Sequence, residues 1–309
     1  MGNFKEFTFP SADGKHEIHC SLWLPNGQPK GVIQIVHGIS EYVNRYDHMA
    51  RFFTEHGFAV CGNDHLGHGR TAAQDGKFGF FAKKGGWDLV LADIRHLRQK
   101  MGEEFPHLPY FLLGHSMGSF LVRTYLCRHP GEISGALLSG TGQEPAWLVA
   151  AGRTLSTLLS ALRGPEYIST LVHNGSIGVY NKQFAPARTS ADWITRDEAV
   201  VDQYLADPFC CNIPTVSLYR DMMTALQYIA SDRALSLMDP NTPVYIYSGD
   251  KDPVGTNGKG VEKVHGYFKK HGTTDLTMKL YPDGRHEMHN ELNRDEVFAD
   301  LLVWLGGHI

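Results

Sequence analysis

The chain has 309 residues with 29 Lys or Arg and 33 Asp or Glu, which gives a formal net charge of -4. This balance argues against a nucleic-acid-binding protein, because such domains are usually strongly basic. With 42% hydrophobic and 20% charged residues, the composition is also too apolar for a disordered chain. Because the length slightly exceeds what one core usually supports, we expect one large domain with an insertion, or two domains.

Cysteine usage and the N-terminus both bear on the location of the protein. The five cysteines are scattered, odd in number and without C-x-x-C spacing, so they favour reduced thiols over a disulfide framework. Residues 1–9 alternate polar and apolar side chains and contain no apolar segment of signal-peptide length. No apolar run approaches the length of a membrane span. We therefore expect a cytoplasmic protein.

The first half of the chain alternates strand and helix patterns. It begins with a predicted hairpin and continues with the unbroken β-branched run of a strand that is buried on both faces. Strands and helices that alternate in this way predict the α/β class, with a mostly parallel sheet and helices on both faces. The expected strands span residues 4–9, 17–24, 31–37, 58–64, 110–113 and 133–138, and the expected helices span residues 46–56, 87–101 and 119–128.

The alternation stops at about Thr141. From there to about Met238 the chain contains helical patterns separated by Gly, Pro and Asn, without a convincing buried strand. We therefore expect a core of residues 1–140 and 239–309 and an inserted helical region of residues 141–238. In the last part of the core, strand patterns return at residues 243–248 and 276–281, and helical patterns at residues 260–270 and 293–305.

A single G-x-S-x-G match, Gly114 to Gly118, lies between an expected strand and an expected helix. The pentapeptide alone is a weak signal, but this placement is typical of the nucleophile elbow of α/β-hydrolases. The glycines allow a strained turn in which the backbone passes close to its neighbours. Such a turn exposes the Ser116 hydroxyl at a helix N-terminus, where negative charge is favoured. Ser116 is therefore the candidate nucleophile.

A serine nucleophile needs a base, and in α/β-hydrolases an acid and then a histidine follow the serine along the chain. The acid should follow the first strand after the insertion, where the turn offers Asp250 and Asp252. Hydrolases of this kind usually show G-x-x-D there, which favours Asp252 and leaves Asp250 as a turn-capping carboxylate. The histidine should lie in the loop after the last strand, which selects His286.

Acyl transfer also needs hydrogen-bond donors for the oxyanion of the tetrahedral intermediate. In α/β-hydrolases one donor is the backbone N–H of the residue after the nucleophile, which is Met117 here. The other donor comes from the loop after the third strand, where Ile39 is the candidate. Both donors belong to the backbone, so replacing either side chain is a poor test of them.

Three other motifs suggest cofactor chemistry, and we set them aside. Residues 286–289 lack the second histidine of the H-E-x-x-H zinc motif, and His65 and His68 have no third metal ligand nearby. Residues 67–72 imitate a dinucleotide fingerprint, but residues 74–76 follow where a helix should start, so we expect a loop there. We expect neither a metal nor a cofactor.

Taken together, the motifs resemble the monoacylglycerol lipase and lysophospholipase branch of the serine α/β-hydrolases, which is grouped with the serine aminopeptidases. In monoacylglycerol lipases, the residues that match Glu41 and Arg45 lie at the polar end of the pocket where glycerol binds. The resemblance implies the same role here, but an internal Glu41–Arg45 ion pair at helical spacing is an alternative that the sequence leaves open. The resemblance covers nearly the whole chain and rests on residues 37–41, 45–46, 64–69, 114–118, 249–252 and 285–287.

By the same resemblance, the inserted region is a lid. Residues 147–162 have the pattern of a helix with one apolar stripe. We favour a helix whose stripe packs on the core beneath it. The alternative is a stripe that lines an acyl tunnel or touches a lipid surface, as in the lipases that the chain resembles. The stripe consists of Trp147, Leu148, Ala151, Leu155, Leu158, Leu159 and Leu162.

The order Ser116, Asp252, His286 and the resemblance imply a serine carboxylesterase for monoacylglycerol-like or lysophospholipid-like esters. The expected partner is thus a small-molecule ester, whereas acyl length, head group and oligomeric state are left open. An aminopeptidase or amidase is the alternative, because peptidases of this group clamp a free amino terminus with lid carboxylates. A ligand receptor without turnover is a third possibility. The lid acids that lie close together in sequence are Asp192, Asp197, Glu198, Asp202 and Asp207.

Overall fold

An eight-stranded sheet runs through the computed structural model, which describes residues 3–309. The strand order is β1-β2-β4-β3-β5-β6-β7-β8. β2 pairs antiparallel with β1 and β4, and all other neighbours are parallel, so the prediction of a mostly parallel sheet is confirmed. The strands are β1 (Asn3–Pro10), β2 (Glu17–Leu24), β3 (Val32–Val36), β4 (Ala59–Asn63), β5 (Tyr110–His115), β6 (Gly135–Ser139), β7 (Val244–Gly249) and β8 (Leu276–Tyr281).

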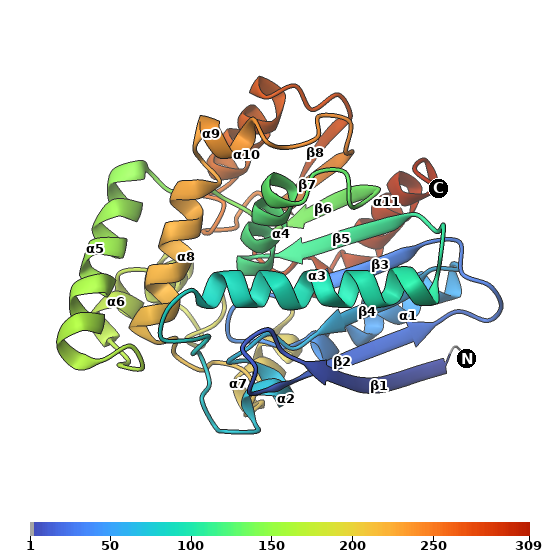
Figure 1. The fold of residues 1–309 in the computed structure, drawn as a ribbon. Coiled ribbons are helices and arrows are strands. Elements are labelled where there is room, and N and C mark those ends of the chain that lie inside the picture. Colours follow the sequence, from blue (N-terminus) through green and yellow to red (C-terminus); the bar gives the residue numbers. More distant parts are fainter. Residues whose placement is uncertain (1–2) are drawn as a thin grey trace.

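Helices cover both faces of the sheet, and each face has its own hydrophobic core (Figure 1). α3, α4 and α10 bury side chains such as Ile94, Leu121 and Val264 against one face. α1 and α11 bury Phe53 and Leu301 against the other face. The residues of β3 to β6 are buried throughout, as expected for strands between two cores. These helices are α1 (Asp47–Glu55), α3 (Gly86–Glu104), α4 (Met117–Arg128), α10 (Lys259–Lys270) and α11 (Arg294–Gly306).

The chain between β6 and β7 forms helices and loops and contributes no strand to the sheet that residues 3–309 form. α8 contacts α3 and α4 of the core, and α5 lies against α8. Both helices lie beyond the carboxyl ends of β5 and β6 (Figure 1). The elements of this inserted helical region are α5 (Ala146–Arg163), α6 (Thr170–Asn174), η2 (Ile177–Phe184), α7 (Glu198–Ala206), α8 (Val216–Tyr228) and α9 (Asp232–Leu235).

The apolar stripe of α5 divides between two sides, so the interpretation that the stripe packs on the core is confirmed only in part. Leu155 and Leu159 are partly buried and pack against the core, whereas other residues of the stripe face outward. Trp147 is 71% exposed, Leu158 55% and Leu162 79%. The buried residues of α5 are Val149 and Ser156. The helix touches the protein mainly along α8, and small residues on this side allow close packing, whereas nothing in residues 3–309 covers the far side.

Three short helical elements complete the core. One of them, α2, contradicts the prediction of a loop over residues 67–72. The carboxylate of Asp64 accepts a hydrogen bond from the Arg70 N–H at 2.8 Å, and this long-range cap satisfies an N–H of the first turn. None of the helices within residues 3–309 combines the length and the apolar character that crossing a bilayer requires. The short elements are η1 (Val43–Tyr46), α2 (Gly69–Ala72) and η3 (Met288–Asn290).

Candidate active site

Ser116 lies in a strained turn between β5 and α4. Its backbone has φ 53° and ψ -121°, in the region that residues with a side chain rarely adopt. A Cβ atom at Gly118 would lie 1.9 Å from the carbonyl oxygen of Val36, and one at Gly114 would lie 2.5 Å from that of Gly118. Only glycine therefore allows α4 to begin this close to β3. The turn places Ser116 at the N-terminus of α4, where developing negative charge is stabilised.

His286 lies in the loop after β8, and its Nδ1 is 3.0 Å from each carboxylate oxygen of Asp252. Asp252 is fully buried and accepts further hydrogen bonds from the Ser248 hydroxyl at 2.8 Å and the Val254 N–H at 2.9 Å. Burial acts to lower the pKa of His286, but the charge and hydrogen bond of Asp252 outweigh it and leave that pKa above its ordinary value. This pairing turns Nε2 away from the carboxylate and leaves it as the acceptor.

Asp250, the other candidate acid, has a different environment. Its carboxylate accepts a hydrogen bond from the Asp283 N–H at 2.8 Å and lies 3.6 Å from the Lys251 ammonium. These contacts tie the turn after β7 to the turn after β8, which is the capping role that the sequence suggested. Of the two acids, it is Asp252 that the structure brings to His286.

Ser116 and His286 line the same cavity, which has a volume of about 140 Å³. We call it the polar cavity. Among residues 3–309 no hydrogen bond joins the Ser116 hydroxyl to the imidazole. Such bonds are often long without substrate and shorten when it binds. Residues that matter below and also line this cavity are Gly38, Ile39, Glu41, His115, Trp193, Tyr204 and Glu287.

The two candidate oxyanion donors border the same place. The N–H groups of Ile39 and Met117 take part in none of the hydrogen bonds found within residues 3–309, so both are free to donate. His37 Nδ1 donates to the Gly38 carbonyl at 2.7 Å, and the Gly38 N–H donates to Glu41 at 2.5 Å. Because C=O and N–H point in opposite directions across a trans peptide, the bond to the Gly38 carbonyl turns the Ile39 N–H away from His37.

Glu41 and Arg45 form the ion pair that the sequence left open, but a third residue joins them. Arg45 Nη1 lies 2.8 Å from Glu41, and the guanidinium also donates two hydrogen bonds of 2.7 Å to Glu287. Glu41 accepts a further bond from the Tyr46 hydroxyl at 2.9 Å. Sequence analysis missed Glu287, although its position beside His286 was a signal that could have found it.

The pKa values of the two carboxylates are shifted in opposite directions. Burial raises the pKa of Glu41 above its ordinary value despite the charge of Arg45. Burial acts in the same direction on Glu287, but there the charge of Arg45 is stronger and holds the pKa of Glu287 below its ordinary value. Two acids and one guanidinium thus leave the polar cavity with excess negative potential beside His286.

A second cavity, of about 60 Å³, begins on the other side of Ser116. We call it the apolar cavity, because most of its lining is aliphatic, aromatic or methionine. Trp193 borders both cavities and so separates the polar space from the apolar one. Sequence analysis gave Trp193 no role, since no motif marks it. The apolar cavity is lined in part by Met117, Phe120, Tyr180, Met222, Leu226 and Val254.

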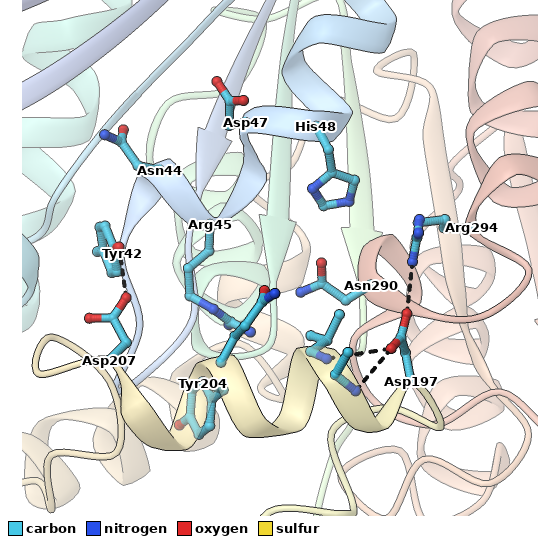
Figure 2. A pocket seen from close by; sticks show the side chains of 13 residues that line it. Tyr42, Asn44, Arg45, Asp47, His48, Asp197, Tyr204, Asp207, Asn290 and Arg294 are labelled. Atoms are coloured by element: carbon cyan, nitrogen blue, oxygen red, sulfur yellow. Dashed lines mark hydrogen bonds and ion pairs between the residues drawn. The ribbon is translucent and has the colours of Figure 1, made fainter.

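A third, outer cavity of about 590 Å³ lies behind Arg45 (Figure 2). Arg45 lies 4.7 Å over the ring of Tyr204, which also borders the polar cavity, so these two side chains form the partition. Asp197 and Asp207 line the outer cavity. Asp197 forms an ion pair with Arg294, and Asp207 accepts a hydrogen bond from the Tyr42 hydroxyl.

The five acids of the inserted helical region therefore do not gather around Ser116. Asp192 accepts hydrogen bonds from Thr189, and Asp202 pairs with Arg188 at 2.7 Å. None of the five acids that the sequence suggested as an amino-terminus clamp lines the polar cavity within the part of the chain that the structure describes. This placement removes the observation that favoured an aminopeptidase.

The buried histidines His37, His65 and His68 lie near the site and pack against one another. The rings of His37 and His65 stack at 3.9 Å, and burial lowers the pKa of His65 to about 3 and that of His68 to about 4. These rings are therefore neutral near pH 7. Within residues 3–309 no group of three or more His, Cys, Asp or Glu side chains is arranged to hold a metal ion.

Residues 27–293 match the family model described as serine aminopeptidase, S33. The chain belongs to this family. Its eight-stranded sheet and nucleophile elbow are those of the α/β-hydrolase fold that the motifs indicated.

Several proteins that are similar to this chain in sequence or structure are named as lipases or esterases. The chain is 29% identical to a monoacylglycerol lipase of Mycolicibacterium smegmatis, over 98% of both chains. It is 27% identical to human monoglyceride lipase, over 96% of this chain and 88% of the human protein. A crystal structure of a highly thermostable carboxyl esterase from Bacillus coagulans, in complex with glycerol, is 31% identical, with a TM-score of 0.92 over 99% of this chain and 98% of the other.

The approach of Gly118 to β3 yields a prediction. Gly118→Ala would push a methyl group against the backbone of Val36, which cannot move aside as a side chain would. Since overpacking usually costs about 1 to 3 kcal/mol, we expect the free energy of unfolding in urea to fall by about 3 kcal/mol. The matched control is Gly266→Ala on α10, where a Cβ atom meets nothing within 4 Å and stability should rise by up to about 1 kcal/mol. Equal stability of the two variants would contradict this account of the elbow.

Proposed function

We propose that this S33 hydrolase is a serine carboxylesterase that cleaves monoacylglycerol-like or lysophospholipid-like esters through an acyl-enzyme. The observation that carries the proposal is that Ser116 and His286 line the same cavity, while Asp252 is hydrogen-bonded to Nδ1 of the His286 imidazole. The names of the monoacylglycerol lipase and carboxyl esterase relatives support an ester substrate.

In the proposed reaction, Ser116 Oγ attacks the ester carbonyl and His286 Nε2 takes the hydroxyl proton. The carbonyl oxygen becomes an oxyanion, which accepts hydrogen bonds from the N–H groups of Ile39 and Met117. Collapse of this intermediate breaks the ester bond, and His286 returns the proton to the leaving alcohol. Water then attacks the acyl-enzyme with His286 again as the base, which releases the fatty acid and restores Ser116. Asp252 orients the imidazole throughout.

The two cavities that meet at Ser116 suggest how an ester would bind. We propose that the acyl chain enters the apolar cavity and that the alcohol enters the polar cavity, where Glu41 presents its carboxylate. Arg45 lines the outer cavity instead, so its proposed contribution is to hold Glu41 in place together with Glu287. The ion pair and the substrate-binding role are thus compatible for Glu41.

We propose that residues 141–238 form a lid on a core of residues 1–140 and 239–309. This division is supported by the five helices α5 to α9, which lie between β6 and β7 and beyond the ends of the central strands (Figure 1). A cytoplasmic location is also part of the proposal, and the free thiols of all five cysteines support a reducing compartment.

The proposed activity can be tested with one substrate panel. We expect turnover of monoacylglycerols, lysophosphatidylcholine and p-nitrophenyl esters, and little turnover of aminoacyl anilides. Ser116→Ala should lower every ester rate by at least about 10⁴-fold, because it removes the nucleophile. A series of acyl lengths in the same panel measures how far the apolar cavity extends.

Three outcomes of this panel and of a labelling experiment on Ser116 would contradict the proposal. A clear preference for the anilides would favour an aminopeptidase or amidase. Failure of a fluorophosphonate to label Ser116, while a lipid still binds, would favour a receptor that does not turn over. Retention of ester hydrolysis by Ser116→Ala would show that the reaction takes place elsewhere.

The two acids after β7 should differ sharply in their effect on turnover. Asp252→Asn keeps the shape of the side chain but removes the charge that orients His286 and stabilises the imidazolium, so we expect kcat to fall by about 10⁴-fold. Asp250→Asn, the matched control, keeps an oxygen that can accept from the Asp283 N–H and should leave kcat near wild type. The comparison uses steady-state hydrolysis of a soluble aryl ester, and the reverse ranking would overturn the assignment.

We also propose that α5 touches a lipid surface transiently. Its exposed stripe continues into Ile168 and Leu171, which are 48% and 67% exposed, so apolar side chains of two neighbouring segments lie on the surface. Arg153 and Arg163 lie on the same helix and suit an anionic or zwitterionic interface.

This proposal predicts that polar substitutions in the stripe weaken binding to lipid vesicles but leave hydrolysis of a soluble ester unchanged. Burying a leucine is worth about 1.5 to 3 kcal/mol, so Leu158→Gln with Leu162→Gln should weaken binding to phosphatidylcholine vesicles by at least about tenfold. Hydrolysis of a soluble aryl ester should be unchanged. The control is Thr154→Gln with Thr157→Gln, at exposed polar positions of the same helix. Equal vesicle binding by the two double variants would argue against a lipid-contacting stripe.

A further inference from the structure

One short stretch of the insertion is hydrogen-bonded to the loop that carries His286. Residues 191–196, which we call the clasp segment, cross the loop that carries His286. The Glu287 N–H donates to the carbonyl of Ile194 at 2.7 Å, and the Thr195 hydroxyl donates to the carbonyl of Asn290 at 2.9 Å. The clasp segment is therefore bonded to the residues on the C-terminal side of His286.

Two arginines close the clasp from opposite sides. Arg285, directly before His286, donates to the carbonyls of Asp192 and Thr195 in the clasp segment. Arg196, at the end of the clasp segment, pairs with the buried Glu291 at 2.8 Å. Because bonds run in both directions and involve charged donors, the clasp segment and the histidine loop are held as one unit.

Within this unit, Trp193 lies against the imidazole of His286. The ring centroids are 4.9 Å apart and the planes are inclined by 33°. The ring of His115 lies 4.6 Å from the imidazole centroid, so a second ring also limits its movement. Trp193 is itself fixed, because its backbone N–H donates to the side-chain oxygen of Asn181 at 3.0 Å and its ring contacts the ring of Tyr180.

A tryptophan in this position has two physical effects on a histidine. Its bulk blocks rotation of the imidazole away from Asp252, and the negative face of the indole attracts a cation within about 6 Å. His286 becomes a cation when it takes the proton of Ser116, so the attraction is greatest as the tetrahedral intermediate forms.

We propose that Trp193 is a positioning residue for His286, which keeps the imidazole oriented and stabilises its protonated form during ester hydrolysis. This inference rests on the proposed role of His286 as the general base. It also assigns a function to the clasp segment, which would otherwise be only part of the connection between η2 and α7.

Other charged groups also influence the protonation of His286, so a test of Trp193 has to leave these groups unchanged. The charge of Asp252 faces Nδ1, and Arg45 compensates part of the charge of the two glutamates. All of them remain in place when only Trp193 is changed. The titratable and charged groups around His286 are Asp252, Glu287, Glu41, Arg45, His115 and His289.

Trp193 also borders both substrate cavities, so its replacement is expected to change KM. A change in KM or kcat alone would therefore not separate substrate contact from an effect on His286. The pH profile of kcat/KM makes this separation, because it reports the pKa of the base in the free enzyme.

The test is the pH profile of kcat/KM with a soluble aryl ester for wild type, Trp193→Phe and Trp193→Leu. The base must be neutral, so activity falls as the pH drops through the pKa of His286. Loss of the indole removes a contact that favours the cation, so the acidic limb of Trp193→Leu should lie about 0.4 to 1.5 pH units lower. The plateau should fall by about 2- to 10-fold, and Trp193→Phe should be intermediate in both.

The matched control is Trp147→Leu, at an exposed tryptophan of the insertion that lies outside both substrate cavities. Its acidic limb should stay at the wild-type pH. An unmoved or raised limb in Trp193→Leu, with that variant folded by circular dichroism, would overturn the inference. If Trp193→Leu does not fold, the position of the Trp193→Phe limb decides in the same way.

A second measurement does not depend on turnover. Protonated imidazole quenches indole fluorescence on contact. A second indole, that of Trp304, lies 4.2 Å from the ring of His308, so the measurement uses Ser116→Ala with Trp304→Phe. This variant should show a drop in emission as His286 titrates. The drop should be absent when Trp193→Phe is added and present when Trp147→Phe is added instead. Its persistence without Trp193 would contradict the inference, whereas ester hydrolysis by Ser116→Ala would contradict the proposed function itself.

Discussion

The backbone at Gly118 lies directly against the carbonyl of Val36, and most of the site follows from this one approach. It forces the chain through the strained turn at Ser116 and fixes where α4 begins. It also brings the residues after β3 beside the serine, since a Cβ atom at Gly38 would lie 3.1 Å from that of Ser116. One steric constraint thus determines the position of the hydroxyl, of the Met117 N–H and of the loop that carries the Ile39 N–H.

Electrostatics joins this arrangement to the histidine loop. Glu41 holds the Gly38 N–H, Glu287 follows His286, and Arg45 bonds to both carboxylates. Three buried charged groups are costly to desolvate, and the two-pronged pairing and the extra hydrogen bonds offset that cost. The excess negative charge also favours a protonated His286, in the same direction as Asp252. A single guanidinium therefore supports both the loop after β3, which carries the proposed oxyanion donor, and the loop of the proposed base His286.

The insertion has two surfaces with different environments. Its inner surface includes Trp193, which contacts His286, and the clasp segment, which is bonded to the histidine loop. Its outer surface includes α5, where Trp147, Leu158 and Leu162 of the apolar stripe are uncovered within the described residues. We propose that α5 touches lipid and that Trp193 positions His286. On both proposals together, one insertion of about a hundred residues would connect a lipid surface to the catalytic site.

The sequence by itself determined the α/β class, each core strand and each of the five long core helices to within three residues, and the candidates Ser116, Asp252 and His286. These follow from local chemistry: β-branched runs favour strands, two glycines permit the elbow, and chain order selects the acid and the base. Only the tertiary structure decided that Glu287 joins the Glu41–Arg45 pair, that Trp193 contacts His286 from 93 positions away, and that part of the α5 stripe faces outward. Periodicity reveals that a helix has an apolar side, but which neighbour covers that side depends on how distant segments pack.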